Sequence, residues 1–225
     1  MKRKVINPSS ASYLLRCPRC FWIKYNVGTY LGTRGKYKDK VCGGLAQPGG
    51  FPAILNHVHK QMEMVNGQRS ENILPGVAGK FIGVEKFSGG SYRGYSIQGR
   101  MDGFIRLDTG HVSVDDWKVT PDIIEGLYDG PMLIYGYCAE SEVESLIPVS
   151  VYPHNFRIIK PGLLESDWVL KPRFIDYDKE KAKWYMDKMI EIIERPTIPE
   201  TTKGKDAKGY PKCSYCHWYD IVKGL

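Results

Sequence analysis

The chain has 225 residues, 42% of them hydrophobic and 25% charged, which excludes a disordered tail, a collagen-like chain and a pure coiled coil. Lysine and arginine number 32 against 25 aspartates and glutamates, and the net charge of +7 suits a nucleic-acid partner as well as it suits an ordinary basic protein. The longest apolar run, residues 132–139, is too short to cross a bilayer, and the basic first residues are not followed by the apolar segment of a secretory signal. We therefore expect a cytoplasmic protein without a membrane segment.

The N-terminal part of the chain predicts two helices separated by a long loop. Ser9 or Ser10 can cap a helix over residues 9–16, and Pro18 then interrupts the pattern. Residues 28–50 hold seven glycines and several lysines, so we expect a loop there. Apolar residues at helical spacing then predict a second helix over residues 52–65.

The middle of the chain predicts a strand meander and then a helix. The expected strands cover residues 80–87, 92–107 and 111–119. The segments 88–90 and 108–110, both rich in turn residues, are expected to connect them. Thr120-Pro121 is typical of a helix start, because threonine caps a helix and proline is tolerated in its first turn. We expect this helix to reach about residue 140, with glycines and a proline disturbing its first half.

The C-terminal part predicts more strands and a last helix. The strands are expected over residues 146–152, 155–159 and 168–174. Asp178 can cap a helix that runs to about residue 194. This order of elements predicts one α/β or α+β domain over residues 1–225, with a core at about 51–195 and helices flanking a central mixed sheet.

Two carboxylates and a lysine form the most informative pattern in the sequence. Asp102 precedes Asp116 by 14 residues across a predicted turn, so the hairpin brings the two onto neighbouring strands. Alternate residues of a strand share a face, which puts Asp116 and Lys118 on one face and Asp115 and Trp117 on the other. Carboxylate oxygens suit Mg²⁺ or Mn²⁺, and such a metal polarises a phosphodiester while a lysine orients the attacking water.

The same residues also have a purely structural explanation. Asp102-Gly103 is a common turn dipeptide, and Asp116 and Lys118 suit a solvated edge strand. Apolar neighbours such as Ile105 and Val114 favour the functional interpretation, because a carboxylate among apolar residues is unfavourable unless it is paired or metal-bound.

The segments Gly99-Arg100-Met101-Asp102 and Asp116-Trp117-Lys118 resemble the motifs of the PD-(D/E)XK nucleases, in particular the RecB-like branch. The resemblance implies a restriction-endonuclease-like core. It also implies that Asp102 and Asp116 are catalytic and bind the metal, with the Trp117 carbonyl as a further ligand. Lys118 would assist the attacking water. Asp115 falls outside the motif because it points to the other face.

The resemblance extends to two helices. The RecB-like branch has a histidine metal ligand on an upstream helix, and His59, nearer the apolar stripe than His57, fits that place; an ordinary surface histidine is the alternative. The branch also has a Gln-x-x-x-Tyr element after the Asp-x-Lys strand. Tyr135 matches the tyrosine, but Pro131 stands in place of the glutamine. By the same resemblance Arg100 and Tyr135 would contact DNA.

Four of the six cysteines form two Cys-x-x-Cys pairs near opposite ends of the chain, Cys17 with Cys20 and Cys213 with Cys216. Such pairs in a cytosolic chain favour a metal over disulfides, and the spacing alone suits structural zinc. Some RecB-like nucleases, the CRISPR-associated ones among them, join their ends with a four-cysteine iron–sulfur cluster. The resemblance therefore implies a 4Fe–4S cluster in a lobe made of residues 9–30 and 200–225, with zinc as the alternative.

These features together predict a metal-dependent deoxyribonuclease that acts on single-stranded DNA or DNA ends. A CRISPR adaptation nuclease that trims spacer precursors is an alternative within the same class. The alternative from another class is a nucleic-acid-binding module with a degenerate nuclease site and a structural zinc, which Pro131 favours. RNA is a further possible substrate.

Overall fold

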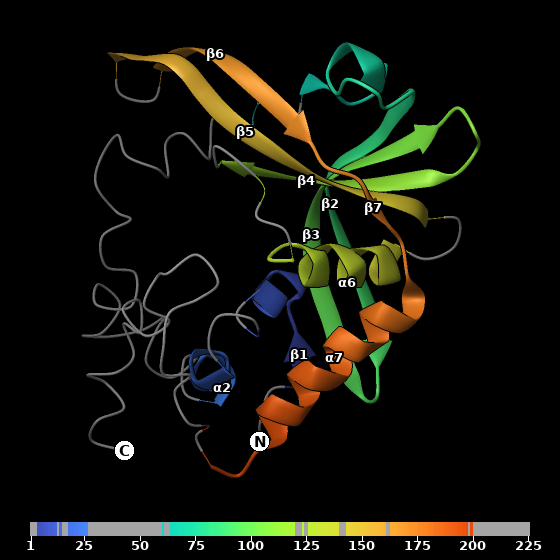
Figure 1. Cartoon of the computed structure of the whole chain (residues 1–225), viewed down its shortest axis with the longest axis vertical. Helices are drawn as coiled ribbons and strands as arrows, with labels where there is room; N and C mark the ends of the chain where they lie inside the picture. Colours follow the sequence, from blue (N-terminus) through green and yellow to red (C-terminus); the bar gives the residue numbers. More distant parts are fainter. Residues whose placement is uncertain are drawn as a thin grey trace.

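The computed structural model describes residues 4–12, 14, 18–26, 60, 64–119, 123, 126–139, 143–160, 163–197 and 199. These residues form a mixed α/β fold in which helices pack against a central mixed sheet, as the sequence predicts (Figure 1). The strands are β1 (Val5–Ile6), β2 (Gly79–Tyr92), β3 (Tyr95–Leu107), β4 (Val112–Val119), β5 (Val143–Lys160), β6 (Leu163–Pro172) and β7 (Ile175–Asp176). The helices are the 3-10 helices η1 (Pro8–Ala11) and η2 (Ser70–Asn72) and the α-helices α2 (Pro18–Asn26), α6 (Asp129–Ala139) and α7 (Lys179–Glu194).

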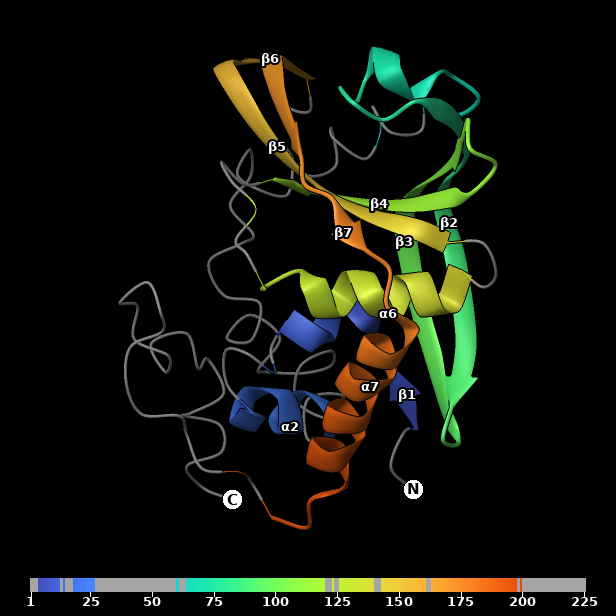
Figure 2. The same cartoon turned by 45° about the vertical axis from the view of Figure 1, so that its right-hand side comes forward.

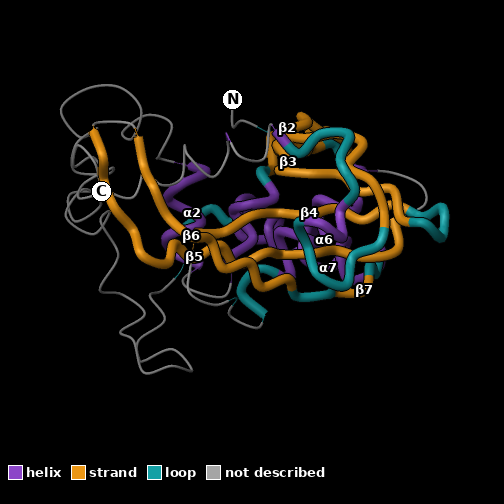
Figure 3. Tube along the Cα trace, turned by 90° about the horizontal axis from the view of Figure 1, so that it is seen from above, coloured by secondary structure: helices purple, strands orange, loops and turns teal. Residues whose placement is uncertain are grey.

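The sheet is centred on β3 and β4. β3 pairs antiparallel with β2 and with β4, and its first part also pairs in parallel with β1. β4 pairs in parallel with β5, and α6 connects these two strands. β5 then pairs antiparallel with both β6 and β7. The β5–β6 hairpin runs out beyond the rest of the sheet, which is clearest from above (Figure 3).

Two hydrophobic clusters pack on the sheet. The larger one contains side chains of α6 and α7 together with Met101, Phe104 and Val114 from the strands. The second contains Leu74, Val77, Phe81, Ile105, Trp117, Ile147 and Val149. Val114 and Trp117 of β4 belong to different clusters, as expected for strand residues of opposite parity, so the clusters cover opposite faces of β4.

The turn between β2 and β3 lies at Arg93 and Gly94, not at residues 88–90 as the sequence suggested. Both turn residues have positive φ, 48° and 77°, which suits a two-residue turn whose twist matches the strands. Gly89 and Gly90 stay inside β2. A Cβ at Gly89 would lie 3.1 Å from the Ile97 carbonyl oxygen, so a close approach of the strands explains that glycine. The turn predicted at 108–110 is confirmed.

Several predicted boundaries need correction. The helix predicted over 9–16 begins as the 3-10 helix η1, residues 12 and 14 are α-helical, and residues 13 and 15–17 lie outside the described residues. Pro18 opens α2, because its missing N–H is not needed in a first turn. The two strands predicted over 146–152 and 155–159 are one strand, β5, with irregular pairing between His154 and Arg157. β6 starts at Leu163, five residues before the predicted strand.

The last helix agrees with the prediction. The Asp178 side chain accepts a hydrogen bond from the Lys181 N–H at 2.9 Å and caps α7. The helix predicted from residue 121 starts later, at Asp129 in α6: residue 123 is not helical and residues 126–128 form a turn, in which Gly126 has a positive φ of 75°. Most of the helix predicted over 52–65 lies outside the described residues. Within the part of the chain that the structure describes, no helix is long and apolar enough to span a membrane.

Helix α2 lies beside α7 (Figure 2). The Trp22 indole N–H donates to the Arg195 carbonyl at 3.0 Å, and the Asn26 amide donates to the Ile193 carbonyl at 3.2 Å. The N-terminal helix is therefore held against the point where the C-terminal segment of the chain leaves α7.

Candidate functional site

The register of β3 and β4 brings Asp102 and Asp116 together. The paired stretch runs from Arg106 opposite Val112 to Gly103 opposite Asp115, so Asp102 and Asp116 occupy the next positions on the two strands. There the Trp117 backbone N–H donates to Asp102 Oδ2 at 2.6 Å. A carboxylate thus accepts a bond that a main-chain carbonyl would otherwise accept in a sheet.

Lys118 completes the group on this face of β4. Its Nζ forms an ion pair with Asp116 Oδ2. Asp102 and Asp116 are only 5% and 2% exposed, whereas the Lys118 side chain is 31% exposed. The three predicted residues therefore form one group in which the carboxylates are buried and the lysine reaches towards solvent.

The pKa values of these groups are strongly coupled. Burial, and next the nearby charge of Asp116, raise the pKa of Asp102 well above its ordinary value, although Lys118 and the Trp117 N–H oppose this. Burial lowers the pKa of Lys118, but Asp116 and Asp102 outweigh it and the net shift is upward; the phenol of Tyr128 adds a smaller contribution. Lys118 is therefore cationic near neutral pH, and a bound cation would relieve the repulsion between the carboxylates.

Tyr135 of α6 packs over the same group. It is buried, and burial together with the charges of Asp116 and Asp102 raises its pKa, so the phenol stays neutral. A Cβ at Gly99 would lie 2.6 Å from Tyr135 Cε1 and 3.0 Å from Pro8 Cγ. The close approach of these rings therefore explains the glycine of the Gly-x-x-Asp motif.

The opposite face of β4 carries a second polar group. Asp115 is fully buried, and its Oδ2 accepts a hydrogen bond from the Trp117 indole N–H at 2.7 Å. Its Oδ1 has no hydrogen-bond partner. Burial raises the pKa of Asp115 to about 7, although the hydrogen bond from Trp117 lowers it. Beside it, the hydroxyls of Ser113 and Ser145 are hydrogen-bonded to each other.

Of the remaining predicted residues, the structure describes only some. Arg100 is exposed on β3. Cys20 belongs to α2, and its side chain is not described. His59, Cys17, Cys213 and Cys216 lie outside the described residues. Cys138 is a buried residue of α6.

Sequence reasoning missed two residues near the candidate site. Tyr128, which directly precedes α6, is close enough to Lys118 to raise its pKa slightly, and its spacing of seven residues from Tyr135 is the signal that could have placed both on one side of the chain there. Asp115 was set aside because it points away from the motif. Its side chain nevertheless holds the indole of the residue between Asp116 and Lys118.

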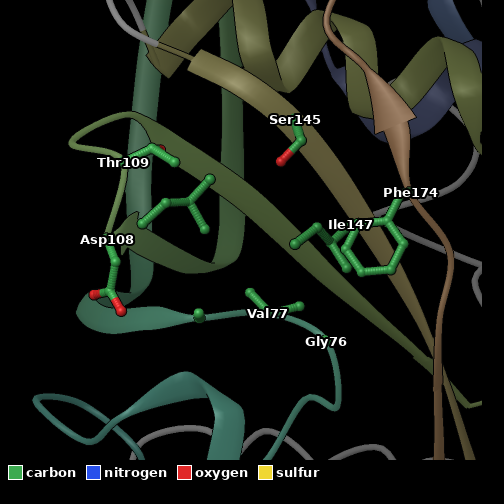
Figure 4. A pocket seen from close by; sticks show the side chains of 9 residues that line it. Gly76, Val77, Asp108, Thr109, Ser145, Ile147 and Phe174 are labelled. Carbon is green, nitrogen blue, oxygen red and sulfur yellow. The ribbon is translucent and has the colours of Figure 1, made fainter.

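A pocket of about 230 Å³ lies elsewhere, at the end of the sheet beside the second hydrophobic cluster. Figure 4 shows Ser145, Ile147 and Phe174 around it. None of the predicted site residues lines it. Its one ionisable lining residue, Asp108, is already bound by both terminal nitrogens of Arg69 at 2.9 and 2.7 Å. The pocket thus has no group ready for acid–base or metal chemistry.

The comparisons with known proteins leave the family open. No family model matches the chain, and no curated protein matches its sequence. Among solved structures it is similar to the one described as the crystal structure of SSO0001, with 18% sequence identity and a TM-score of 0.46 over 100% of this chain and 88% of that chain. At that level of similarity the neighbour assigns neither a fold family nor a function, and function is inferred from the residues of this chain.

Proposed function

We propose that the protein is a divalent-metal-dependent deoxyribonuclease of the RecB-like type, with a restriction-endonuclease-like core, that hydrolyses phosphodiester bonds in single-stranded DNA or at DNA ends. One observation carries the proposal. Asp102, Asp116 and Lys118 meet at the point where β3 and β4 stop pairing, with both carboxylates buried and the lysine side chain partly exposed. Two buried like charges beside one cation are unfavourable for stability alone, and this favours a functional role.

The donor set of this site suits Mg²⁺ or Mn²⁺. Mg²⁺ is usually held by one or two carboxylates, with waters and substrate phosphates completing its shell, and Asp102 and Asp116 supply two carboxylates on one face. Among the described residues no group of three or more His, Cys, Asp or Glu side chains is arranged so that it could hold a metal ion. A third ligand would therefore be the Trp117 carbonyl, or His59, which lies outside the described residues.

When bound, the metal supplies a Lewis acid that polarises the phosphodiester and lowers the pKa of a water. The residues of the chain position the metal ligands and the attacking water. The Trp117 N–H holds Asp102 in one orientation, and Lys118 keeps its proton on Nζ, where it can hydrogen-bond the attacking water and offset the developing negative charge. Tyr135 closes the side of the site that faces α6.

The proposal includes a cluster that joins the two ends of the chain through Cys17, Cys20, Cys213 and Cys216. The packing of α2 on the end of α7 supports it, because Cys20 belongs to α2 and the C-terminal segment follows α7. We expect protein purified without oxygen to be brown, with absorbance near ~400 nm from thiolate-bound iron. A colourless sample with one zinc per chain would replace the cluster by zinc.

End-labelled single-stranded DNA with Mg²⁺ or Mn²⁺ tests the activity. We expect the wild type to degrade it, and Lys118→Ala to lose at least about 100-fold in rate, within the range for removing one donor that stabilises developing negative charge. Lys188→Ala, which removes an exposed lysine of α7 paired with Glu191, is the matched control and should keep full activity.

Three outcomes are distinguishable. Equal turnover by Lys118→Ala and the wild type would place the chemistry elsewhere. DNA binding in EDTA without cleavage under either metal would favour the binding-module alternative, for which Pro131, a buried residue of α6 with no polar side chain, is the supporting observation. Faster turnover of a matched RNA would change the substrate class and keep the site.

A further inference from the structure

We infer that Asp115, which lies outside the nuclease motif, is a positioning residue: through the indole of Trp117 it fixes the backbone segment that carries both charged residues of β4. The inference rests on the proposed function. It assigns to the far face of the sheet a role in binding the metal, although no side chain of that face would touch it.

The contact that carries the inference joins two residues of the same strand. Asp115 Oδ2 accepts from Trp117 Nε1 at 2.7 Å, and both side chains are buried, Asp115 completely and Trp117 to 95%. A bond between side chains two positions apart on one face of a strand restricts how the chain between them can rotate. The residue between them is Asp116, whose side chain points to the opposite face towards Lys118.

Trp117 transmits this restraint to the candidate site through its own backbone. Its N–H holds Asp102 Oδ2 at 2.6 Å, and its carbonyl is the group that would serve as a further metal ligand. A rotation of the backbone at Trp117 would therefore displace the Asp102 carboxylate, the Trp117 carbonyl oxygen and the Lys118 backbone at the same time. The indole, packed with Ile147 and Val149 and bound by Asp115, opposes that rotation.

The sheet accommodates Asp115 in a way that stability does not explain. Its Oδ1 is buried without a hydrogen-bond partner, which is unfavourable in an apolar layer. The residue opposite Asp115 on β3 is Gly103, and only glycine fits there, because a Cβ would lie 2.4 Å from Asp115 Oδ1 and 2.6 Å from Oδ2. Glycine weakens the interior of a strand. The unpaired oxygen of Asp115 and the glycine opposite it are both unfavourable for stability, and both accompany the one hydrogen bond to Trp117. Such departures from local stability are expected at functional sites.

Metal binding without DNA tests the inference separately from catalysis. Mn²⁺ is titrated calorimetrically into the wild type, Asp115→Ala, Trp117→Phe and Asp115→Asn. The first two variants remove one partner of the bond each, and both should bind Mn²⁺ at least about 10-fold more weakly than the wild type. Asp115→Asn keeps an oxygen acceptor for the indole and should stay within about 3-fold of the wild type.

The matched control is Ser113→Ala. It removes another buried polar group from the same face of β4, two residues away, whose hydroxyl bonds only to Ser145. This variant should bind Mn²⁺ as the wild type does. Loss of affinity in Ser113→Ala equal to that in Asp115→Ala would indicate a general loosening of the sheet and overturn the positioning role.

The remaining outcomes are also decisive. Mn²⁺ affinity of Asp115→Ala equal to that of the wild type would overturn the inference and leave the proposed nuclease intact. If Asp115→Ala does not fold, Trp117→Phe decides by the same criterion, since it keeps an aromatic ring at this position and removes the indole N–H. Absence of Mn²⁺ binding by the folded wild type would overturn the proposed site and the positioning role together.

Discussion

The two faces of β4 differ although their residues alternate along a single strand. On the face towards α6, Asp116 and Lys118 form an ion pair with Asp102 and Tyr135 nearby, and the Lys118 side chain is partly exposed. On the other face, Asp115 binds the Trp117 indole in a completely buried setting. The pKa of Asp115 is about 7, so a large part of this carboxyl group is neutral near neutral pH.

Under the proposed function, this difference shows how a sheet can separate the groups that react from those that hold them in place. Because successive residues point to opposite faces, a reactive pair and its support can be adjacent in sequence and still not compete for the same space. The supporting carboxyl group of Asp115 can be neutral and buried, while the opposite face carries the charged groups Asp116 and Lys118. Substitutions on the two faces should therefore affect different quantities.

The largest effect is expected on activity, from the face towards α6. Asp102→Asn keeps an acceptor for the Trp117 N–H but removes a charged ligand, and metal charge stabilisation is worth several kcal/mol, so cleavage should fall by at least ~100-fold. Its free energy of unfolding at pH 8 should equal or exceed that of the wild type, because a buried like charge disappears. Cleavage rates and urea unfolding measure the two effects. A loss of stability as large as the loss of activity would contradict the separation.

The next effect is expected on stability, from the other face. Gly103→Ala places a Cβ 2.4 Å from Asp115 Oδ1 and should lower the free energy of unfolding by about 2–3 kcal/mol, as overpacking does. Asp115→Ala combined with Gly103→Ala removes the clash and should destabilise less than the two single substitutions added together. Additive effects in urea unfolding would show that the two positions do not meet.

The pH dependence of stability should distinguish the buried acid. The folded pKa of Asp115 is raised to about 7 from an ordinary 3.8, so the folded state holds a proton that the unfolded state has lost. The contribution of Asp115 is full below about pH 4 and is lost as the pH rises through 7. In EDTA, the wild type should lose about 1–2 kcal/mol more between pH 5 and 7 than Asp115→Asn does. Parallel curves for the two proteins would contradict a proton on Asp115.

The smallest effect is expected from the hydroxyl pair beside Asp115. Ser113→Ala leaves the half-buried Ser145 hydroxyl without its partner and should lower the free energy of unfolding by about 1 kcal/mol, with no change in the cleavage rate. Thermal unfolding and the DNA assay measure both. A fall in cleavage with unchanged stability would mean that the Ser113 position, too, acts on the candidate site.

Part of the candidate site could be read from the residues alone. The 14-residue separation of Asp102 and Asp116, with turn residues at 108–110 between them, was sufficient to place the two on neighbouring strands. The alternation along β4 separated Asp116 from Asp115 correctly. The position of the β2–β3 turn was predicted wrongly, because Gly89 and Gly90 have the composition of a turn and stay extended for a long-range reason.

The sequence by itself determined the local features of this protein: the cap at Asp178, the turn at 108–110, the apolar strands and the faces on which their charged residues lie. These depend on spacing and on short-range hydrogen bonds. Only the tertiary structure decided that Gly99 accommodates Tyr135, that Gly103 accommodates Asp115, and that Asp102 accepts the Trp117 N–H. Each of these contacts joins segments that pair or pack over a distance in the chain, and burial, which sets the pKa values, exists only once those segments have met.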